Sequence, residues 1–560
     1  MAKLDFKMEP DAIYCVPLGG CGVFGANMTL YGHQGKWIML DCGMGFADDT
    51  MPGIDILLPD PTFAESLGSS LLGILLTHGH EDHIGAIENL WPRLNKAPLY
   101  ATAFTAERIR QDLNERNWGN QVTLNQLPAK AQFEIGPFSI EYVEMAHSIP
   151  EANAVAITVK GVGTIVHTGD WKIDKDPVVG NKTDEAALTR LGNAGVLALV
   201  GDSTNAMVPG HSGSERDVEK NLIELFAEFK GQIAITCFST NVARLRTIYT
   251  AAKANNRQVC LLGRSLWSID DVARKTGYLK DVPPFLDDEE AGGMEAEQVV
   301  YVCTGSQGEP RAAMAKISND DHPAIRLDEG DVVIFSSRAI PGNERAIDRI
   351  RNRLLQMGVA VVTDRDARIH VSGHPYRDEL KALYSWVKPK VAIPVHGEHM
   401  QQEKHAQLAK DCGVPEVFLP ENGMVIELTA EGARLMGRVK SGILAIEGSR
   451  IVAIDHEAIL TRKRMMFNGS AVVTVVIDRD GQLLAPPKVT AMGLLDETSE
   501  TDSDHLDDVS EAISKVIKNM PKNQRGDDAV LSELVRVTAR RYFNDTFDRK
   551  PQTRVHLVRV

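Results

Sequence analysis

The sequence has little of what marks an exported or membrane-spanning protein. No apolar run reaches the roughly 18 residues of a membrane helix, and the first 20 residues lack the apolar centre of a secretory signal. The seven cysteines are odd in number and form no Cys-x-x-Cys pair, unlike a disulfide framework or a zinc ribbon. We therefore expect a cytoplasmic protein without a membrane partner, with reduced and mostly buried thiols.

Positive charge is also scarce. Lysine and arginine number 61 against 76 aspartates and glutamates, which gives a net charge of −15. A polyanion such as RNA is repelled by this total charge at long range, so binding it requires a local basic groove or the charge of a metal ion. No internal repeat or long low-complexity tract is present, and 560 residues predict about three to four folded domains.

A glycine motif at residues 20–25 is the first candidate for a binding site. GCGVFG matches the dinucleotide-binding pattern G-x-G-x-x-G, and Asp41 follows at the distance of a ribose-binding carboxylate. That pattern must open a helix, however. The residues that follow have no helical period, and their His-Gln-Gly turn between apolar stretches indicates a β-hairpin. We therefore do not expect a dinucleotide cofactor.

The rhythm of the chain changes twice. Short strands and glycine-rich turns fill the first 200 residues, strands alternate with helices from about 214 to 370, and short strands then return. This pattern predicts a strand-rich domain interrupted by a parallel α/β insert. The last part indicates a hairpin, two amphipathic helices and a closing strand, while the acidic run at 496–508 predicts a solvated loop. The expected boundaries are 1–212 and 371–450 for the interrupted domain, 213–370 for the insert, 451–465 for a linker and 466–560 for the last domain.

The densest chemistry lies in HGHEDH, residues 78–83, which follows the short apolar run of a buried strand. Imidazoles and carboxylates together are typical ligands of zinc or a similar divalent ion. His147, Asp170 and His396 each follow another apolar strand. Each alone suits a structural role, but together they complete two ion sites: His78, His80 and His147 for one, Asp82, His83 and His396 for the other, with Asp170 as a bridge. Water between two such ions can attack a phosphorus or carbonyl centre.

These residues carry a resemblance to a known family. Asp41, HGHEDH, His147, Asp170 and His396 resemble the five motifs of the metallo-β-lactamase fold. GDSTNA at 201–206, HVSGH at 370–374 and PVHGE at 394–398 resemble motifs A, B and C of the β-CASP nucleases, and the order of motifs over the whole chain is similar to the ribonuclease J family. The resemblance implies an α/β fold: a metallo-β-lactamase αββα sandwich interrupted by an α/β β-CASP domain, plus a small α+β C-terminal domain.

The resemblance also implies an activity. It suggests a metal-dependent ribonuclease of RNA maturation and decay, including rRNA processing and mRNA decay. Such an enzyme is a 5′-to-3′ exonuclease that prefers 5′-monophosphorylated RNA, with possible endonuclease activity, and uses hydroxide held by two metal ions. The implied ions are zinc, with manganese or magnesium as alternatives. The implied partners are single-stranded RNA, a second copy or three further copies of the chain, and RNA-decay proteins.

The resemblance assigns roles to individual residues. His370 is expected at the scissile phosphate, with Asp82 and Asp170 as the other catalytic residues. Asp41 is expected to orient a ligand histidine, and Asp202 to act likewise. A pocket for the 5′ phosphate and RNA is expected from Ser372, Gly373 and His374, with Ser239 and Asn241 as weaker candidates, and a basic channel from Arg244, Arg264 and Arg311.

Two other functions use part of the same pattern. A hydrolase of small esters explains the metal ligands but leaves the insert and HVSGH without a purpose. A non-catalytic RNA-binding protein predicts that ligands are missing, whereas all seven are present.

Overall fold

The computed structural model describes residues 8–48, 50–116, 118–119, 121–340, 342–496 and 498–560. The chain divides into two compact units. Unit 1 comprises the residues up to Phe46 together with Leu57–Ile443, and unit 2 comprises Ala47–Ile56 with Leu444–Val560. No described helix is long and apolar enough to cross a membrane.

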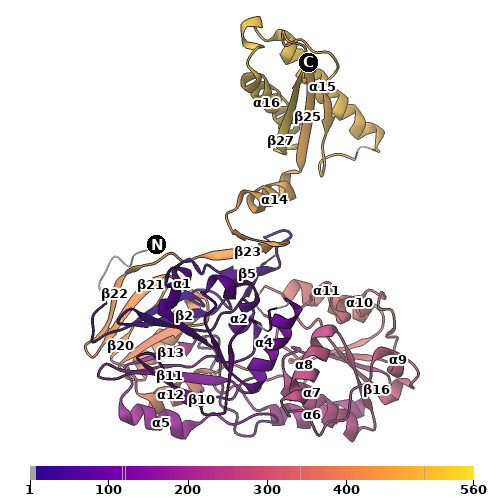
Figure 1. Ribbon diagram of the computed structural model, residues 1–560. Helices are drawn as coiled ribbons and strands as arrows, with labels where there is room; N and C mark the ends of the chain where they lie inside the picture. The colour runs from indigo at the N-terminus through magenta and orange to yellow at the C-terminus, as the bar shows by residue number, and fades with distance from the viewer. Residues whose placement is uncertain (1–7, 49, 117, 120, 341, 497) are drawn as a thin grey trace. The chain divides into compact units, whose positions relative to one another are not determined.

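The strand-rich part of unit 1, formed by residues on both sides of the insert, is built on two sheets that face each other (Figure 1). One sheet has eight strands in the order β22 (Gly432–Arg438), β21 (Met424–Thr429), β1 (Ile13–Gly19), β2 (Met28–His33), β3 (Lys36–Leu40), β6 (Leu71–Leu75), β7 (Leu99–Thr102), β8 (Leu124–Leu127). The other has seven, in the order β20 (Glu416–Val417), β19 (Val391–Val395), β13 (Ala198–Asp202), β12 (Gly163–His167), β11 (Asn153–Val159), β10 (Phe138–Glu144), β9 (Gln132–Ile135).

Apolar side chains from both sheets form one core between them. Tyr31 and Leu75 of the first sheet and Val155, Ile157 and Ile393 of the second belong to the same buried cluster. A second cluster lies on the other face of the seven-stranded sheet and includes side chains from α5 (Glu185–Ala194), α12 (Arg377–Val387) and α13 (His399–Asp411). The eight-stranded sheet is connected by helices α1 (Thr62–Ser66), α3 (Ile87–Leu90) and α4 (Ala103–Glu115). Helix α4 packs against β7 and β8. This is the αββα sandwich that the sequence predicted.

The residues after the glycine motif form the predicted hairpin. Residues 28–40 are the antiparallel strands β2 and β3 with Gln34 and Gly35 at their turn, so the motif is followed by a strand and does not open a helix. The backbone at Gly25 leaves little space, because a Cβ there would lie 3.1 Å from the carbonyl oxygen of Met44.

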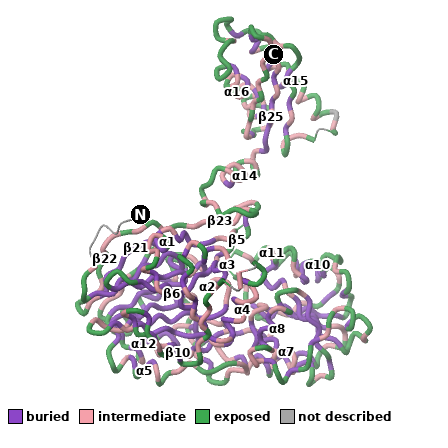
Figure 2. The backbone as a smooth tube through the Cα atoms, viewed as in Figure 1, coloured by how far each residue is buried: buried purple, intermediate pink, exposed green. Residues whose placement is uncertain are grey.

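The insert is a five-stranded sheet whose neighbouring strands are all parallel. Its strands are rich in valine and isoleucine because both faces are covered (Figure 2). Their order is β15 (Gln258–Leu262), β16 (Val299–Cys303), β14 (Ile233–Thr236), β17 (Val332–Phe335), β18 (Ala360–Val362). The helices on one face are α6 (Glu215–Glu228), α7 (Val242–Ala254) and α8 (Arg264–Lys275), and on the other α9 (Asp288–Ala291), α10 (Ala313–Ser318) and α11 (Glu344–Gln356).

Unit 2 holds a small α+β domain. Its central strand β25 (Ser470–Ile477) pairs antiparallel with β26 (Lys488–Thr490) and parallel with β27 (Gln552–Arg559). Two long helices cover one face of this sheet, α15 (Glu500–Asn519) and α16 (Asp528–Phe547). The expected hairpin, two helices and closing strand are therefore all present.

Two segments differ from our expectation. The predicted linker 451–465 holds the end of β24 (Arg450–Ala453) and most of α14 (Glu457–Asn468). The acidic run 496–508 was predicted as a loop, but from residue 500 onward it is helical. The reason is that Val509, Ile513 and Ile517 follow at helical spacing and are buried against the sheet, so the helix extends back through the acidic residues. Residue 497 of this run lies outside the described residues.

Candidate metal centre

Seven side chains converge at the ends of four strands of the sandwich. The chain leaves β6, turns, and enters the short helix α2 (Glu81–Ile84), which places His78 and His80 in the turn and Asp82 and His83 in the helix. The other three lie just beyond further strands, His147 after β10, Asp170 after β12 and His396 after β19. Strand ends at one edge of a sandwich bring residues far apart in sequence into one small volume.

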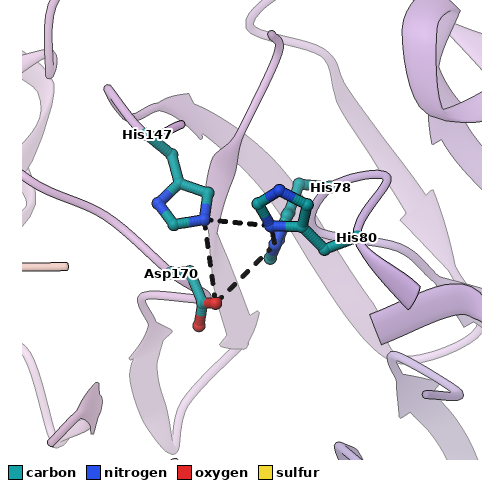
Figure 3. A group of neighbouring side chains, drawn as sticks. All are labelled: His78, His80, His147 and Asp170. Atoms are coloured by element: carbon teal, nitrogen blue, oxygen red, sulfur yellow. Dashed lines mark hydrogen bonds and ion pairs between the residues drawn. The ribbon is translucent and has the colours of Figure 1, made fainter. Parts of the chain in front are cut away.

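The first group consists of His78, His80, His147 and Asp170 (Figure 3). The Nδ1 atom of His80 lies 3.0 Å from Nε2 of His78 and 3.1 Å from Nε2 of His147. Oδ2 of Asp170 lies 3.7 Å from Nε2 of His78 and 3.8 Å from Nε2 of His147. A tetrahedral zinc ion with bonds of 2.0 to 2.1 Å separates its ligand atoms by about 3.3 Å, so this group has the dimensions of a divalent-metal site.

The second group consists of Asp82, His83, His396 and the same Asp170. Oδ2 of Asp170 lies 3.3 Å from Nε2 of His83 and 3.5 Å from Nε2 of His396. The same oxygen atom thus faces both groups. The other oxygen of Asp170, Oδ1, is buried and has no hydrogen-bond partner among the described residues. An unpartnered buried carboxylate oxygen is costly, and a bound cation satisfies it.

Neighbouring groups hold the ligand rings in place through their second nitrogen. Nδ1 of His83 lies 2.6 Å from Oδ2 of Asp41, whose other oxygen accepts a hydrogen bond from the backbone N–H of Thr77. Nδ1 of His147 donates to the carbonyl oxygen of Gly373 at 2.6 Å. Such partners fix the tautomer and orientation of a metal-binding imidazole. Asp41 therefore lies where it can orient the ring of His83.

Two ligand-orienting partners were absent from the sequence predictions. Oδ1 of Asn27 lies 3.0 Å from Nδ1 of His396, and Oγ1 of Thr77 lies 3.0 Å from Nδ1 of His78. Thr77 directly precedes the cluster, and its position was a usable signal. Asn27 follows the glycine motif and carries no such signal, because its partner is 369 residues away.

Burial and charge determine the protonation of the centre. Burial, reinforced by neighbouring histidines, lowers the pKa of His78 and His147 well below the usual range, and burial lowers that of His80 to about 4. Neutral imidazole is the form that binds metal ions. Burial opposes ionisation of Asp170, but the charges of His396 and His83 outweigh it and hold the pKa of this carboxyl well below its usual range.

A further histidine joins the centre. His374 forms a group with Asp170, Asp202 and His396, and its Nδ1 lies 2.8 Å from Oδ2 of Asp202 and 3.9 Å from Oδ2 of Asp170. Burial lowers the pKa of His374, but the carboxylates of Asp202 and Asp170 outweigh it and raise the pKa to about 9. The sequence assigned His374 to a phosphate pocket, and only the fold places it against the ligands.

His370 lies in a different setting. Its Nδ1 is buried without a hydrogen-bond partner among the described residues, and its pKa is lowered well below the usual range by burial and by the charges of Arg244, Arg338 and Lys172. His370 is not among the groups that could hold an ion. Two residues on, Oγ of Ser372 accepts hydrogen bonds from Nδ2 of Asn205 and from the backbone N–H of His374.

The two weaker candidates for the phosphate pocket lie on the insert. Ser239 and Asn241 follow β14, and the Asn241 side chain caps helix α7 by accepting from the backbone N–H of Arg244. The expectation that Arg244 lines an open channel is wrong. Its side chain is fully buried, forms a salt bridge with Glu215, and donates to the backbone oxygens of Ser336 and Ile369. Arg264 and Arg311 are exposed.

Comparison with known proteins agrees with this architecture. Four family models match: the metallo-beta-lactamase superfamily over 21–211, the ribonuclease J beta-CASP domain over 230–354, the Zn-dependent metallo-hydrolase RNA specificity domain over 358–420, and the ribonuclease J C-terminal domain over 457–560. The third match covers both His370 and His396.

Several proteins that match this chain over nearly their whole length are named ribonuclease J. The chain is 40% identical to a ribonuclease J of Sinorhizobium meliloti over 100% of this chain and 99% of that protein. It is 35% identical to those of Mycolicibacterium smegmatis, over 97% of each chain, and Mycobacterium tuberculosis, over 95% of each. A crystal structure of a protein of unknown function from Enterococcus faecalis shares the fold, with a TM-score of 0.54 and 17% identity over 74% of this chain and 100% of that one. With its paired ligand groups and these relatives, the chain belongs to the ribonuclease J family of metal-dependent nucleases.

Proposed function

We propose that this protein is a 5′-to-3′ exoribonuclease that prefers 5′-monophosphorylated RNA, cuts internally at the same centre, and acts in RNA maturation and decay, including rRNA processing and mRNA decay. The observation that carries the proposal is the pair of ligand groups sharing Oδ2 of Asp170, with His374 of the loop 369–374 directly beside them. A centre of this kind suits hydrolysis of a phosphodiester whose charge is spread over several oxygens.

Two divalent ions are proposed as the cofactors, zinc first and manganese or magnesium as alternatives. His78, His80 and His147 would hold one ion, Asp82, His83 and His396 the other, and Asp170 both. When bound, such a pair supplies an ionised water and neutralises charge on the phosphate. The softer imidazole nitrogens, five of the seven ligands, favour zinc over magnesium.

Residues of the loop 369–374 complete the proposed chemistry. Because Asp202 occupies Nδ1 of His374, Nε2 is the nitrogen left to contact a substrate. We assign His374 the role of donating a proton to the leaving oxygen. Asp202 is assigned the role of orienting the His374 ring. For His370 we keep the expected contact with an RNA phosphate, because its unpartnered Nδ1 lies among three cations that favour an anion.

The proposed 5′-phosphate pocket uses Ser372, Gly373 and the ring of His374. Oγ of Ser372 already accepts two hydrogen bonds, so its own O–H is available as a donor to a terminal phosphate. Ser239 contributes from the loop after β14, and Asn241 shapes that loop by capping α7. A compact pocket of donors accommodates a monophosphate better than a triphosphate.

The test compares RNA labelled at the 3′ end with RNA labelled at the 5′ end, each carrying a 5′ monophosphate or triphosphate. We expect faster loss of the monophosphate form with release of mononucleotides. Ser372→Ala should lower this exonuclease activity far more than internal cleavage, while His78→Ala should remove both. Equal losses of both activities in Ser372→Ala, or no preference for the monophosphate, would contradict the pocket. A thioester, assayed with and without chelator, tests the small-ester alternative.

We also propose that the chain assembles into a homodimer or homotetramer and meets other RNA-decay proteins in the cytoplasm. The support is the C-terminal domain, whose match to the ribonuclease J family begins at residue 457. Removal of 457–560 should lower the number of chains per particle, which is the mass measured by light scattering divided by the mass of the shortened chain. An unchanged number of chains would exclude a role of this domain in assembly.

A further inference from the structure

One cavity of the insert lies outside the centre described above. It has a volume of about 330 Å³ and lies at the carboxyl end of β17 and β18, where Arg338 follows β17, Arg365 follows β18, and Arg351 projects from α11. Ligands of parallel α/β sheets bind at this edge, in the loops beyond the strand ends. Pocket volumes of this size suit a small polar group or one nucleotide unit.

The three guanidinium groups in this cavity have no protein acceptor among the described residues, and those of Arg338 and Arg365 are exposed to solvent. None donates a hydrogen bond to a described residue. The nearest carboxylate oxygens are those of Asp348, at 3.5 Å from Nη1 of Arg351, and Asp364, at 4.0 Å from Nε of Arg338. Nε of Arg351 is buried without a partner, while its guanidinium stacks on the ring of Phe335 at 4.7 Å. A stacked, oriented fork of donors without an acceptor matches the geometry of a phosphate.

Other arginines of the insert are used differently. Arg244 and Arg274 place their donors on carboxylates and backbone oxygens of the protein itself. The carboxylates around the cavity are also partly engaged: Glu344 accepts from the backbone N–H of Gly342. Exposed arginines such as Arg264 and Arg311 also donate no hydrogen bond to a described residue, so what distinguishes this cavity is that three such arginines line one hollow.

The loop that carries Arg338 lies beside the loop 369–374, which reaches the metal ligands. Oγ of Ser336, two residues before Arg338, donates to the carbonyl oxygen of Ile369 at 2.6 Å. The loop after β17 thus runs beside His370, on which the charge of Arg338 acts directly.

We propose that this arginine cavity is a binding site for a backbone phosphate of the RNA strand, at a distance from the scissile bond. The inference rests on the proposed nuclease function, because it takes the ligand at the metal centre to be RNA. The cavity contributes affinity for longer strands and leaves the chemistry to the metal ligands. The cavity lining also carries Glu344, Asp348 and Asp364, so the proposed attraction comes from the oriented donors of the arginines and not from a net positive charge.

The experiment uses the metal-loaded full chain with Arg338→Gln, Arg351→Gln and Arg365→Gln. Binding is measured with a 20-nucleotide phosphorothioate RNA, and hydrolysis with the natural RNA and with bis(p-nitrophenyl) phosphate. The side chain of Arg365 is exposed and forms no hydrogen bond or ion pair with a described residue, so its variant should fold normally. The matched control is Arg326→Gln, an exposed arginine of the same domain that does not line the cavity.

Each cavity variant should bind the long RNA roughly tenfold more weakly, the loss expected for a charged hydrogen bond. The slope of log affinity against log salt concentration should become shallower by about 0.7 for each phosphate contact removed. Arg326→Gln should behave as the unchanged protein does. Unchanged RNA affinity and salt slope in all three variants would overturn the proposal. An equally large loss of hydrolysis of bis(p-nitrophenyl) phosphate would also overturn it, because the substitutions would then have damaged the metal centre.

Two further outcomes are distinguishable. If adenosine monophosphate competes with RNA in the unchanged protein but not in Arg351→Gln, and the salt slope stays the same, the cavity binds a free nucleotide and the strand assignment is wrong. If the metal-loaded protein hydrolyses neither RNA nor the small diester, the proposed function fails. The binding measurement still decides whether the arginines hold RNA.

Discussion

Asp41→Asn is the most informative single change at the metal centre. Oδ1 of Asp41 accepts from the backbone N–H of Thr77 at 2.8 Å, and Oδ2 faces Nδ1 of His83 at 2.6 Å. Asp41 itself has a φ of +59°, a left-handed conformation that asparagine tolerates better than most residues. The substitution therefore keeps the size and the backbone of this position and changes one oxygen into an NH2 group.

The amide has no arrangement that satisfies both neighbours. If its oxygen keeps the Thr77 N–H, its NH2 donates to Nδ1 of His83 and shifts the ring proton to Nε2, the atom that faces the second ligand group. If the amide flips, two donors meet at Thr77 and a buried group stays unpaired, which costs about 1 to 3 kcal/mol. Loss of such an orienting partner typically lowers metal affinity by about 10- to 100-fold. We expect this loss in the second group and little change in the first.

The assay is competition with a chelator of known affinity, followed by metal analysis of the protein at each chelator concentration. The unchanged protein should release two ions, and Asp41→Asn should release one of them at roughly 10- to 100-fold lower chelator concentration. Asp60→Asn is the control, since Asp60 is also buried and also accepts from a threonine N–H and hydroxyl but contacts no histidine. Retention of both ions by Asp41→Asn at unchanged affinity would refute the orienting role.

Two further predictions concern the metal centre, and a third concerns His405, a buried histidine of α13 whose Nδ1 lies 2.9 Å from Oγ of Ser203 and whose Nε2 lies 2.8 Å from the hydroxyl of Tyr384. Asp170→Ala should lose both ions and all hydrolysis while keeping a folded circular dichroism spectrum; turnover near normal with metal supplied would exclude a bridge. Gly373→Ala should lose the first ion and both cleavage activities, because its Cβ would lie 2.9 Å from Cε1 of His147. Normal metal content in this variant would show that the loop shifts without disturbing His147. Burial lowers the pKa of His405 to about 4, so the stability it provides is complete above about pH 6.5 and is lost as the pH falls toward 4. The free energy of unfolding of the unchanged protein should therefore drop by up to about 3 kcal/mol more than that of His405→Gln between pH 7 and pH 4, and parallel curves in urea titrations would contradict this.

Much of the fold could be predicted because its signals are local. Buried parallel strands are short apolar runs, helices repeat their apolar residues every three or four positions, and the change between these patterns marks the insert. The acidic run before Val509 was misjudged because its charges were weighed without the apolar positions of the same helix. That error was avoidable from the sequence.

The ligand residues were predictable for a related reason. His78 to His83 are adjacent in sequence, and His147, Asp170 and His396 each follow a strand, so their type and position already restrict the chemistry. What the pattern did not contain was the spatial role of each atom. The shared oxygen of Asp170 and the unpartnered Nε of Arg351 result from side-chain directions that depend on the packing of several elements.

The sequence by itself determined that this protein has a histidine and aspartate metal centre, an interrupted strand-rich domain and the motifs of a ribonuclease family, because residue type and spacing carry that information. Only the tertiary structure decided which histidine of HVSGH lies beside the ligands, and that Arg244 is buried against Glu215. It also decided that Gly373 supports His147. These contacts join residues up to 226 positions apart, and their distances follow from how the sheets pack and not from any local pattern.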